Sequence, residues 1–374
     1  MGETLDAGMK KILVLTATVK ISVLLLILLA SRHFTFQDQN YLSNFHYPAG
    51  EPIGIWTLFK TWDAQHYLYL ADQGYKPNQI SNAYFPLLPW LIGYTKPLLG
   101  ESGLVAGLLL SNAFALLAMV FLYRLIRDLF DERTAWGTCL LLLSFPMAFF
   151  SGLVYTESLF LFLTTVFFYC QTKGIWKGAA SAAFFLPLTR PTGLLIFIPI
   201  VVELFLNKKK PKNTVLVLLF AVMGGGFYFL TLQSLTGDGL GGFGAQKSFG
   251  TGHLAVFDMN PFQWVSKNFI HLHYTLDDLK TSFVDRAAFL GFLAVIPFAW
   301  RNFSVALFAY LLAIGISGAV SVDLASYARY LSALFPFFVL LAIPIKEKAW
   351  LLALGCFPLQ AYFVVRHALN YWVS

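Results

Sequence analysis

Residues 62–75 read WDAQHYLYLADQGY, and a second aromatic stretch, AYFPLLP, follows at residues 83–89. If the first stretch forms a helix, Asp63, His66 and Tyr67 lie at positions i, i+3 and i+4 and share one face. Apolar side chains about a quarter-turn away form a second face, and Gly74 ends the helix. This pattern predicts a short amphipathic helix on a bilayer surface, with an acidic tip.

The composition is that of a multi-span membrane protein. Of the 374 residues, 58% are hydrophobic and 12% are charged, and a water-soluble domain cannot bury so much apolar surface. The formal net charge is +7, but Lys and Arg cluster in short loops between apolar runs, as cytoplasmic loops do. We therefore expect membrane lipids and no nucleic acid as partners. The three cysteines lie in apolar segments without pair spacing, which indicates neither disulfides nor a metal site.

The apolar runs predict an all-α, polytopic membrane protein with about 11 transmembrane helices. We expect one domain of residues 1–374, with long extracytoplasmic loops at residues 31–102 and 234–286. The third span is expected at residues 135–150 and a late one at residues 330–345. Lys20 interrupts the first span; the preferred interpretation is that it snorkels to the cytoplasmic side, and the alternative is a role inside the membrane.

Residues 178–206 form an apolar segment that is long for one span and short for two, since a span needs about 20 residues. Arg190 and Pro191 interrupt it near the middle, and basic clusters flank both of its ends. Because basic loops stay in the cytoplasm, the segment must enter the membrane and return. Arg190 is then expected at the bend, either at the far surface or buried in the protein.

The basic turns also assign the remaining loops to two sides of the membrane. With a cytoplasmic N-terminus, the segments that carry Asp63, Glu157, Arg190 and Arg329 all lie on the extracytoplasmic side. A site that transfers a sugar from a lipid phosphate to a hydroxyl needs such groups. A carboxylate accepts the hydroxyl proton, guanidiniums hold the phosphate, and aromatic rings contact the sugar and the isoprenoid chain.

Each of these residues also has a structural interpretation. Asp63 would cap the surface helix through its carboxylate, and Glu157 would sit favourably at the start of a helix. Arg329 would snorkel at the membrane interface. His66 is interpreted as a structural hydrogen-bonding residue in preference to a base.

Two further patterns carry no prediction of a bound group. His271 and His273, with Asp277 and Asp278, resemble a metal cluster only superficially, because no further ligand at fixed spacing accompanies them. The glycine-rich run at residues 237–242 has the letters of a dinucleotide fingerprint but follows a membrane span, not a β-strand. We expect neither a metal nor a cofactor.

Several motifs, in chain order, resemble those of a known family. They are residues 62–75 with 84–89, residues 145–160, residues 190–193, and Arg329-Tyr330 with Phe335-Pro336. The series is similar to the PIG-V family, the mannosyltransferase that adds the second mannose during GPI-anchor assembly, and to its prokaryotic relatives. The first two motifs are fairly specific, and the last is weak alone.

The resemblance implies a GT-C glycosyltransferase fold with amphipathic helices in the first extracytoplasmic loop. It implies a polyprenyl- or dolichyl-phosphate sugar as donor, with mannose as the leading sugar, and an inverting transfer to a lipid or glycan acceptor. It further implies Asp63 as the catalytic base and Arg190 and Arg329 as contacts to the donor phosphate. The expected substrate-binding residues are Trp62, His66, Tyr67, Glu157, Arg190, Arg329 and Tyr330.

The chain is short beside eukaryotic members of the family and has no ER retention tail, which favours a prokaryotic plasma membrane over the ER membrane. The alternative function is a transporter or flippase of a lipid-linked sugar. Transporters favour repeated halves with broken helices at the midplane, whereas this chain has one broken segment and gathers its polar residues at one face. The sequence therefore favours an integral-membrane hexosyltransferase.

Overall fold

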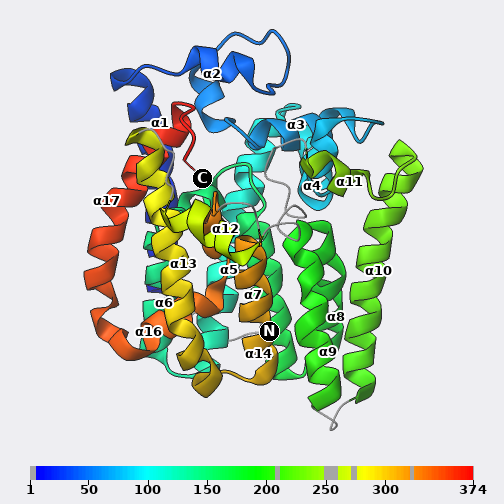
Figure 1. Cartoon of the computed structure of the whole chain (residues 1–374), viewed down its shortest axis with the longest axis vertical. Coiled ribbons are helices and arrows are strands. Elements are labelled where there is room, and N and C mark those ends of the chain that lie inside the picture. Colours follow the sequence, from blue (N-terminus) through cyan, green and yellow to red (C-terminus); the bar gives the residue numbers. More distant parts are fainter. Residues whose placement is uncertain (1–5, 207–210, 248–259, 271–275, 321–323, 374) are drawn as a thin grey trace.

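The computed structural model describes residues 6–206, 211–247, 260–270, 276–320 and 324–373, without the side chains of residues 276–282. Every regular element in this part of the chain is helical, which confirms the predicted all-α class there. Long helices form the body of the molecule, and short helices gather at one end of it (Figure 1).

The helices follow one another along the chain, with short 3-10 or π turns labelled η. They are α1 (Ala7–His33), α2 (Asp38–Ser43), η1 (Ile55–Phe59), α3 (Ala64–Gln73), η2 (Ile80–Ala83), α4 (Leu87–Thr95), η3 (Lys96–Leu99), α5 (Gly103–Leu129), α6 (Glu132–Ser144), η4 (Ala148–Gly152), α7 (Glu157–Lys173), α8 (Trp176–Phe185), η5 (Leu186–Leu188), η6 (Pro191–Ile196), α9 (Phe197–Leu206), α10 (Pro211–Thr236), α11 (Gly241–Gln246), α12 (Pro261–Val265), η9 (Ser266–Ile270), α13 (Leu276–Asn302), α14 (Val305–Ala319), α15 (Tyr327–Leu331), α16 (Phe335–Ile345), η10 (Lys346–Lys348) and α17 (Ala349–Ala368).

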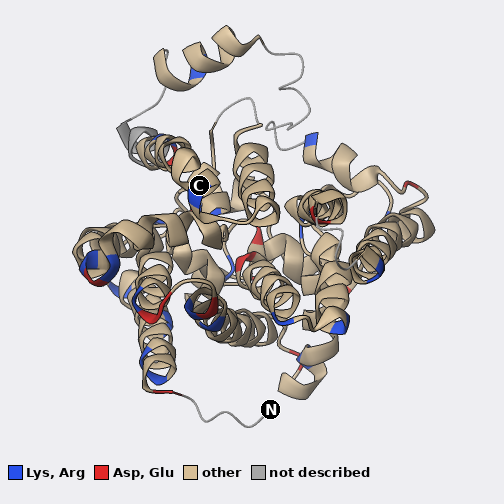
Figure 2. Ribbon diagram, turned by 90° about the horizontal axis from the view of Figure 1, so that it is seen from below, with Lys and Arg blue, Asp and Glu red and all other residues tan. Residues whose placement is uncertain are grey.

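The two ends of the molecule differ in what they contain. The short helices α2, α3, α4 and α11 lie at the upper end in Figure 1, and the α5–α6, α13–α14 and α16–α17 turns lie at the lower end. Seen from below, most charged segments lie around the outside of the molecule, and a few lie near its centre (Figure 2). Charges in the middle of an apolar bundle need partners, because burying an unpaired charge is costly.

Among the described residues, four helices are long and apolar enough to cross a membrane. They are α1, α5, α10 and the part of α13 from Phe283 to Asn302. Residues Pro191–Leu206 and helix α14 are apolar but shorter. The total of about 11 spans stays a prediction.

Two of the predicted spans have different boundaries in the structure. The span predicted at residues 135–150 ends with α6 at Ser144, because Phe145 precedes Pro146 and adopts an extended ψ of 139°. The span predicted at residues 330–345 is divided between α15 and α16, and Pro336 lies in the first turn of α16. In both places, a proline sets the helix boundary.

The broken segment at residues 178–206 enters the bundle and returns, as the sequence predicts. Helix α8 is followed by the turns η5 and η6, and α9 then returns to the lower end, where α10 begins (Figure 1). Both α8 and α9 pack on α10. Arg190 lies at the bend with 6% of its surface exposed, so it takes the buried position of the two that were expected.

Lys20 does not snorkel, so the preferred interpretation of this residue is wrong. It is 6% exposed, and its Nζ donates hydrogen bonds to the Ser151 hydroxyl and, at 3.4 Å, to the Ala148 carbonyl in η4. Acceptors inside the protein therefore take the place that water would have at the membrane surface.

Two glycines of α10 test the packing of α8 on α10. A Cβ on Gly224 would overlap the Phe184 carbonyl, whereas one on Gly226 would meet no atom within 4 Å. Gly224→Ala should therefore destabilise the protein by about 1–3 kcal/mol through overpacking. Gly226→Ala should be neutral or stabilising by up to about 1 kcal/mol, because Ala favours the helix. Thermal melting of the purified protein in detergent measures both; equal melting temperatures for the two variants would contradict the packing.

Candidate active site

The stretch around Asp63 forms α3 but not a surface helix. Gly74 ends α3 with a φ of 67°, and its N–H donates to the Leu70 carbonyl, as the sequence predicts. However, residues 64–68 and Leu70 are all buried, and α3 packs on α4 and α5. The predicted amphipathic helix on a bilayer surface is therefore wrong at α3, because protein encloses this helix on most sides.

Asp63 precedes α3, but its side chain makes no capping hydrogen bond, so the capping interpretation is wrong. Its Oδ1 instead accepts a hydrogen bond from the Tyr84 hydroxyl at 2.9 Å. Its Oδ2 accepts one from Nη1 of Arg329 at 2.7 Å. The side chain of Asp63 stays 25% exposed, so this carboxylate is the accessible end of the cluster.

Glu157 is the first residue of α7, where a carboxylate faces the positive end of the helix dipole, so this structural expectation holds. Its Oε1 also accepts a hydrogen bond from Nε of Arg329 at 2.8 Å and lies 3.6 Å from Nη1 of Arg190. The Glu157 side chain is 1% exposed, and its Oε2 has no hydrogen-bond partner among the described residues. Glu157 is thus the buried centre of the cluster.

Arg329 therefore joins two carboxylates with one guanidinium. Its side chain is 12% exposed, so the expectation that it snorkels is wrong. Charge-assisted hydrogen bonds of this kind are short and strong, and they compensate the cost of burying the four charges. The structure brings together Asp63, Glu157, Arg190 and Arg329, which the sequence predicted on one face.

Aromatic rings surround the two guanidiniums. The guanidinium carbon of Arg329 lies 4.7 Å from the ring centre of Phe150 and 4.7 Å from that of Tyr155. That of Arg190 lies 5.1 Å from the Tyr330 ring and 5.6 Å from a second ring, Phe160. These distances allow cation–π attraction. Tyr330, an expected substrate-binding residue, therefore borders the cluster beside Arg190.

His66 is sandwiched between two aromatic rings. Its ring centre lies 4.1 Å from that of Phe45 and 4.5 Å from that of Tyr84, and its Nδ1 lies 2.9 Å from the Ser81 hydroxyl. Burial lowers the pKa of His66 to about 4, although the charge of Asp63 acts to raise it. The ring is therefore neutral at pH 7, and its two ring stacks and its contact with Ser81 favour its structural interpretation.

Tyr67 and Trp62 flank the cluster in different ways. The Tyr67 hydroxyl lies 3.5 Å from Oγ1 of Thr156, and burial raises the pKa of Tyr67 well above its usual value, so the phenol stays protonated. Trp62 has a left-handed φ of 56° and packs edge-on against Trp372, with ring centres 5.0 Å apart. Of these two expected residues, Tyr67 lies beside the charged cluster, and Trp62 packs against the C-terminal segment.

Two opposing effects set the pKa of Asp63. Burial raises this pKa, but the charge of Arg329 and its hydrogen bond lower it by more, with smaller help from Tyr84. The pKa of Asp63 is therefore held below its ordinary value of 3.8. The carboxylate is ionised at neutral pH and ready to accept a hydrogen bond from a hydroxyl.

Some residues of the site were not singled out from the sequence. Tyr84, Phe150 and Tyr155 contact the charged groups and lie within the recognised motifs. Asp285 of α13 had no such signal; its carboxylate accepts a hydrogen bond from the Ala328 N–H at 2.7 Å and so fixes α15, the helix that carries Arg329. Only the folded chain shows this contact.

The superficial metal pattern of the sequence lies outside the part of the chain that the structure describes. His271 and His273 lie outside the described residues, as do the side chains of Asp277 and Asp278. Within the described ranges, no group of three or more His, Cys, Asp or Glu residues could hold a metal ion. All three cysteines are free, as predicted.

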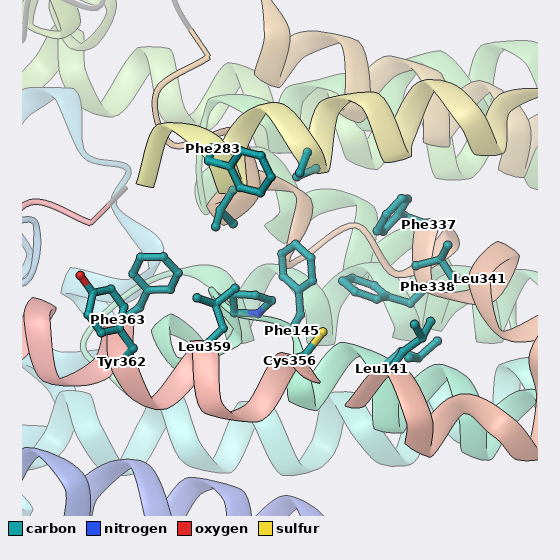
Figure 3. A pocket seen from close by; sticks show the side chains of 15 residues that line it. Leu141, Phe145, Phe283, Phe337, Phe338, Leu341, Cys356, Leu359, Tyr362 and Phe363 are labelled. Atoms are coloured by element: carbon teal, nitrogen blue, oxygen red, sulfur yellow. The ribbon is translucent and has the colours of Figure 1, made fainter. Parts of the chain in front are cut away.

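An apolar cavity of about 810 Å³ lies between α6, α13, α16 and α17. Phe283, Tyr362 and Phe363 lie at one end of it, and Leu141 and Leu341 at the other (Figure 3). Val284 also lines the cavity, and it directly precedes Asp285, which binds α15. Helix α13 therefore lines the cavity and also binds the helix that carries Arg329.

Comparisons with known proteins bear on the fold of the chain. The family described as dolichyl-phosphate-mannose-protein mannosyltransferase matches residues 81–224. The oligosaccharyltransferase of Archaeoglobus fulgidus, solved with Zn and sulfate, superposes with a TM-score of 0.51 at 14% identity, over 96% of this chain and 53% of that chain. The same organism's AglB, in complex with an inhibitory peptide and a dolichol-phosphate, gives 0.50 at 12% identity, over 96% and 56%. No curated protein matches.

These likenesses show the fold. The chain has a helical fold similar to that of the archaeal oligosaccharyltransferase, and four of its described helices are long and apolar enough to cross a membrane. It spans about half the length of the solved structures that it resembles.

The burial of His66 predicts a loss of stability in mild acid. The folded-state pKa of about 4 lies below the ordinary value of 6.5, so the unfolded chain binds more protons between these values. The free energy of unfolding therefore falls as the pH drops from 6.5 to 4, by at most about 3 kcal/mol. The contribution of Asp63, whose pKa is lowered, is lost only below about pH 4.

Melting temperatures in detergent at pH 7 and pH 5 measure this effect. His66→Gln should reduce the fall in melting temperature, whereas the same change at the exposed His33 should leave the wild-type fall intact. An unchanged fall in the His66 variant would contradict the assignment.

Proposed function

We propose that this protein is a glycosyltransferase that moves a hexose, with mannose as the first candidate, from a polyprenyl- or dolichyl-phosphate donor to an acceptor on the extracytoplasmic face. The observation that carries the proposal is the single guanidinium of Arg329 in contact with both Asp63 and Glu157. The dolichyl-phosphate-mannose named for the matching family and the dolichol-phosphate bound to AglB support the donor class.

In the proposed reaction, a hydroxyl oxygen of the acceptor attacks the anomeric carbon of the donor. Asp63 takes the hydroxyl proton, within hydrogen-bond reach. The bond between the anomeric carbon and the phosphate oxygen breaks, and its electron pair stays on the lipid phosphate, so the configuration inverts. Negative charge grows on the phosphate during this step, and Arg329 and Arg190 stabilise it.

The charges of the cluster explain how the donor would activate the base. Two carboxylates already neutralise the two guanidiniums, so a donor phosphate must compete for their N–H groups. Arg329 holds Glu157 through Nε and Asp63 through Nη1. Transfer of Nη1 from Asp63 to the phosphate would keep Arg329 anchored and would raise the basicity of Asp63. Donor binding then precedes proton removal.

The cavity between α6, α13, α16 and α17 offers the donor an apolar place for its lipid tail. Its lining is apolar, and α13, which supplies part of that lining, also binds the helix of Arg329 through Asp285. With the phosphate at Arg329, the isoprenoid chain would follow α13 from α15 toward the cavity. The tail would then lie in the cavity.

The proposal also covers the sugar that is transferred and the orientation of the chain in the membrane. The motifs similar to those of the PIG-V family favour mannose, and the basic turns between the apolar runs favour a cytoplasmic N-terminus. A panel of polyprenyl-phosphate sugars, with transfer and release of free lipid phosphate as readouts, tests the sugar. A flippase would move the donor across vesicles without releasing lipid phosphate.

Asp63→Asn should abolish transfer while the protein still folds. The amide keeps the shape of the side chain and Arg329 keeps Glu157 as its partner, but the amide cannot take the proton. A general base contributes about 10²–10⁴-fold to rate, so a loss of at least about 100-fold is expected. Asp72→Asn on the same helix, which breaks an exposed pair with Lys96, is the matched control and should keep wild-type activity. Transfer from a radiolabelled donor measures both; a fully active Asp63 variant would remove Asp63 from the mechanism.

Filling the cavity should weaken the binding of long-chain donors more than that of short-chain donors. Ala287 lines the cavity on α13, whereas Leu290, on the same helix, is 54% exposed and does not line it. Ala287→Trp should raise the KM for a long-chain donor about tenfold or more, since each lost buried CH₂ contact is worth up to about 0.8 kcal/mol. A donor with two isoprene units should be affected less, and Leu290→Trp should affect neither. Equal effects on both donors would exclude the cavity as the tail site.

A further inference from the structure

Lys20 is a buried cation that the proposed reaction does not use. It lies in α1, one of the four long apolar helices among the described residues, and is 6% exposed. A lysine at the centre of a membrane helix costs roughly 2.5–3.5 kcal/mol on insertion scales. Its recorded partners are a hydroxyl and a carbonyl, both of η4, and no carboxylate in the described ranges forms an ion pair with it. Lys20, which is costly to bury in a membrane, thus makes its hydrogen bonds to one short turn, η4.

Contacts from two helices fix this turn. Nζ of Lys20 donates to Ser151 and Ala148, and the Ser151 hydroxyl also donates to the Ala148 carbonyl at 2.5 Å. From α5, Nδ2 of Asn112 donates to the Gly152 carbonyl at 2.9 Å. A Cβ on Gly152 would lie 3.2 Å from Cδ of Lys20, which is tighter than ordinary van der Waals contact. The lysine stem and η4 are therefore closely packed.

The same turn forms one wall of the charged cluster. Phe150, inside η4, faces the guanidinium of Arg329 at 4.7 Å. The chain then continues to Tyr155, at the same distance from Arg329, and to Glu157, which binds Nε of Arg329. A shift of η4 would move the aromatic wall and the carboxylate that together orient Arg329.

We propose that Lys20 is a positioning residue of the transferase site: its ammonium holds η4, and η4 holds Phe150, Tyr155 and Glu157 around Arg329. The proposal rests on the function proposed above. Lys20 does not touch the reacting atoms, so it acts through the orientation of Arg329 toward the donor phosphate. Misplacement of a binding group by about 1 Å can cost about 100-fold in rate.

Lys20→Met tests the proposal, because methionine keeps the length of the stem and removes the ammonium. We expect the variant to insert and elute as the wild type does, since it loses a costly charge in the membrane. Its kcat/KM for the donor should fall about tenfold or more, while the KM for the acceptor stays unchanged. Ser151→Ala should also lower kcat/KM for the donor, but by a smaller factor. Lys11→Met, an exposed site on the same helix, should behave as the wild type.

Binding of the sugar-free polyprenyl phosphate to the purified protein gives a second readout, independent of turnover. We expect Lys20→Met to weaken it, and Lys20→Arg, which keeps the charge, to restore part of the affinity. Wild-type kinetics and wild-type affinity in Lys20→Met would overturn the proposal, as would a lower melting temperature with unchanged kinetics per folded molecule. If Lys20→Met does not fold, Ser151→Ala decides by the same readouts. Failure of the wild type to transfer from any donor would instead overturn the proposed function.

Discussion

One guanidinium shared by two carboxylates constrains the whole upper end of the protein. Arg329 contacts Asp63 at 2.7 Å and Glu157 at 2.8 Å, and Glu157 also lies near Arg190. In an apolar bundle such charges are tolerated only together, because removing one partner leaves an uncompensated buried charge that costs about 3–5 kcal/mol. The first loop, the start of α7, the bend after η5 and the short α15 must therefore meet at one place.

This requirement accounts for features that look unrelated along the chain. Helix α7 begins at Glu157 and not earlier, so its carboxylate reaches Arg329. The bend near Arg190 interrupts an apolar segment, and Asp285 on α13 fixes the backbone beside Arg329. Lys20 and Asn112 secure the turn that supplies Phe150. Buried polar groups from distant segments thus support one another through the fold, and Oε2 of Glu157 is left without a hydrogen-bond partner among the described residues.

Composition and the distribution of basic residues predicted the long helices and the side of the membrane on which each loop lies. The predictions failed where a residue's environment depends on packing against segments far away in the sequence. Apolar length predicted the long helices, and basic turns predicted that Asp63, Glu157, Arg190 and Arg329 share a face. Helix boundaries were wrong at Pro146 and Pro336, where a local proline effect outweighs hydropathy. The enclosure of α3 was missed as well, and a position of Lys20 inside the membrane was only the alternative to snorkelling. Their partners are far away in sequence, and an amphipathic or snorkelling pattern is the same whether lipid or protein covers it.

An experimental structure with a polyprenyl phosphate bound tests the central claim most directly. The account predicts phosphate oxygens within hydrogen-bond distance of Arg329 or Arg190, with Nη1 of Arg329 withdrawn from Asp63 and its Nε still on Glu157. The lipid tail should enter the apolar cavity beside α13. A phosphate bound elsewhere, with the pair between Arg329 and Asp63 intact, would contradict the account.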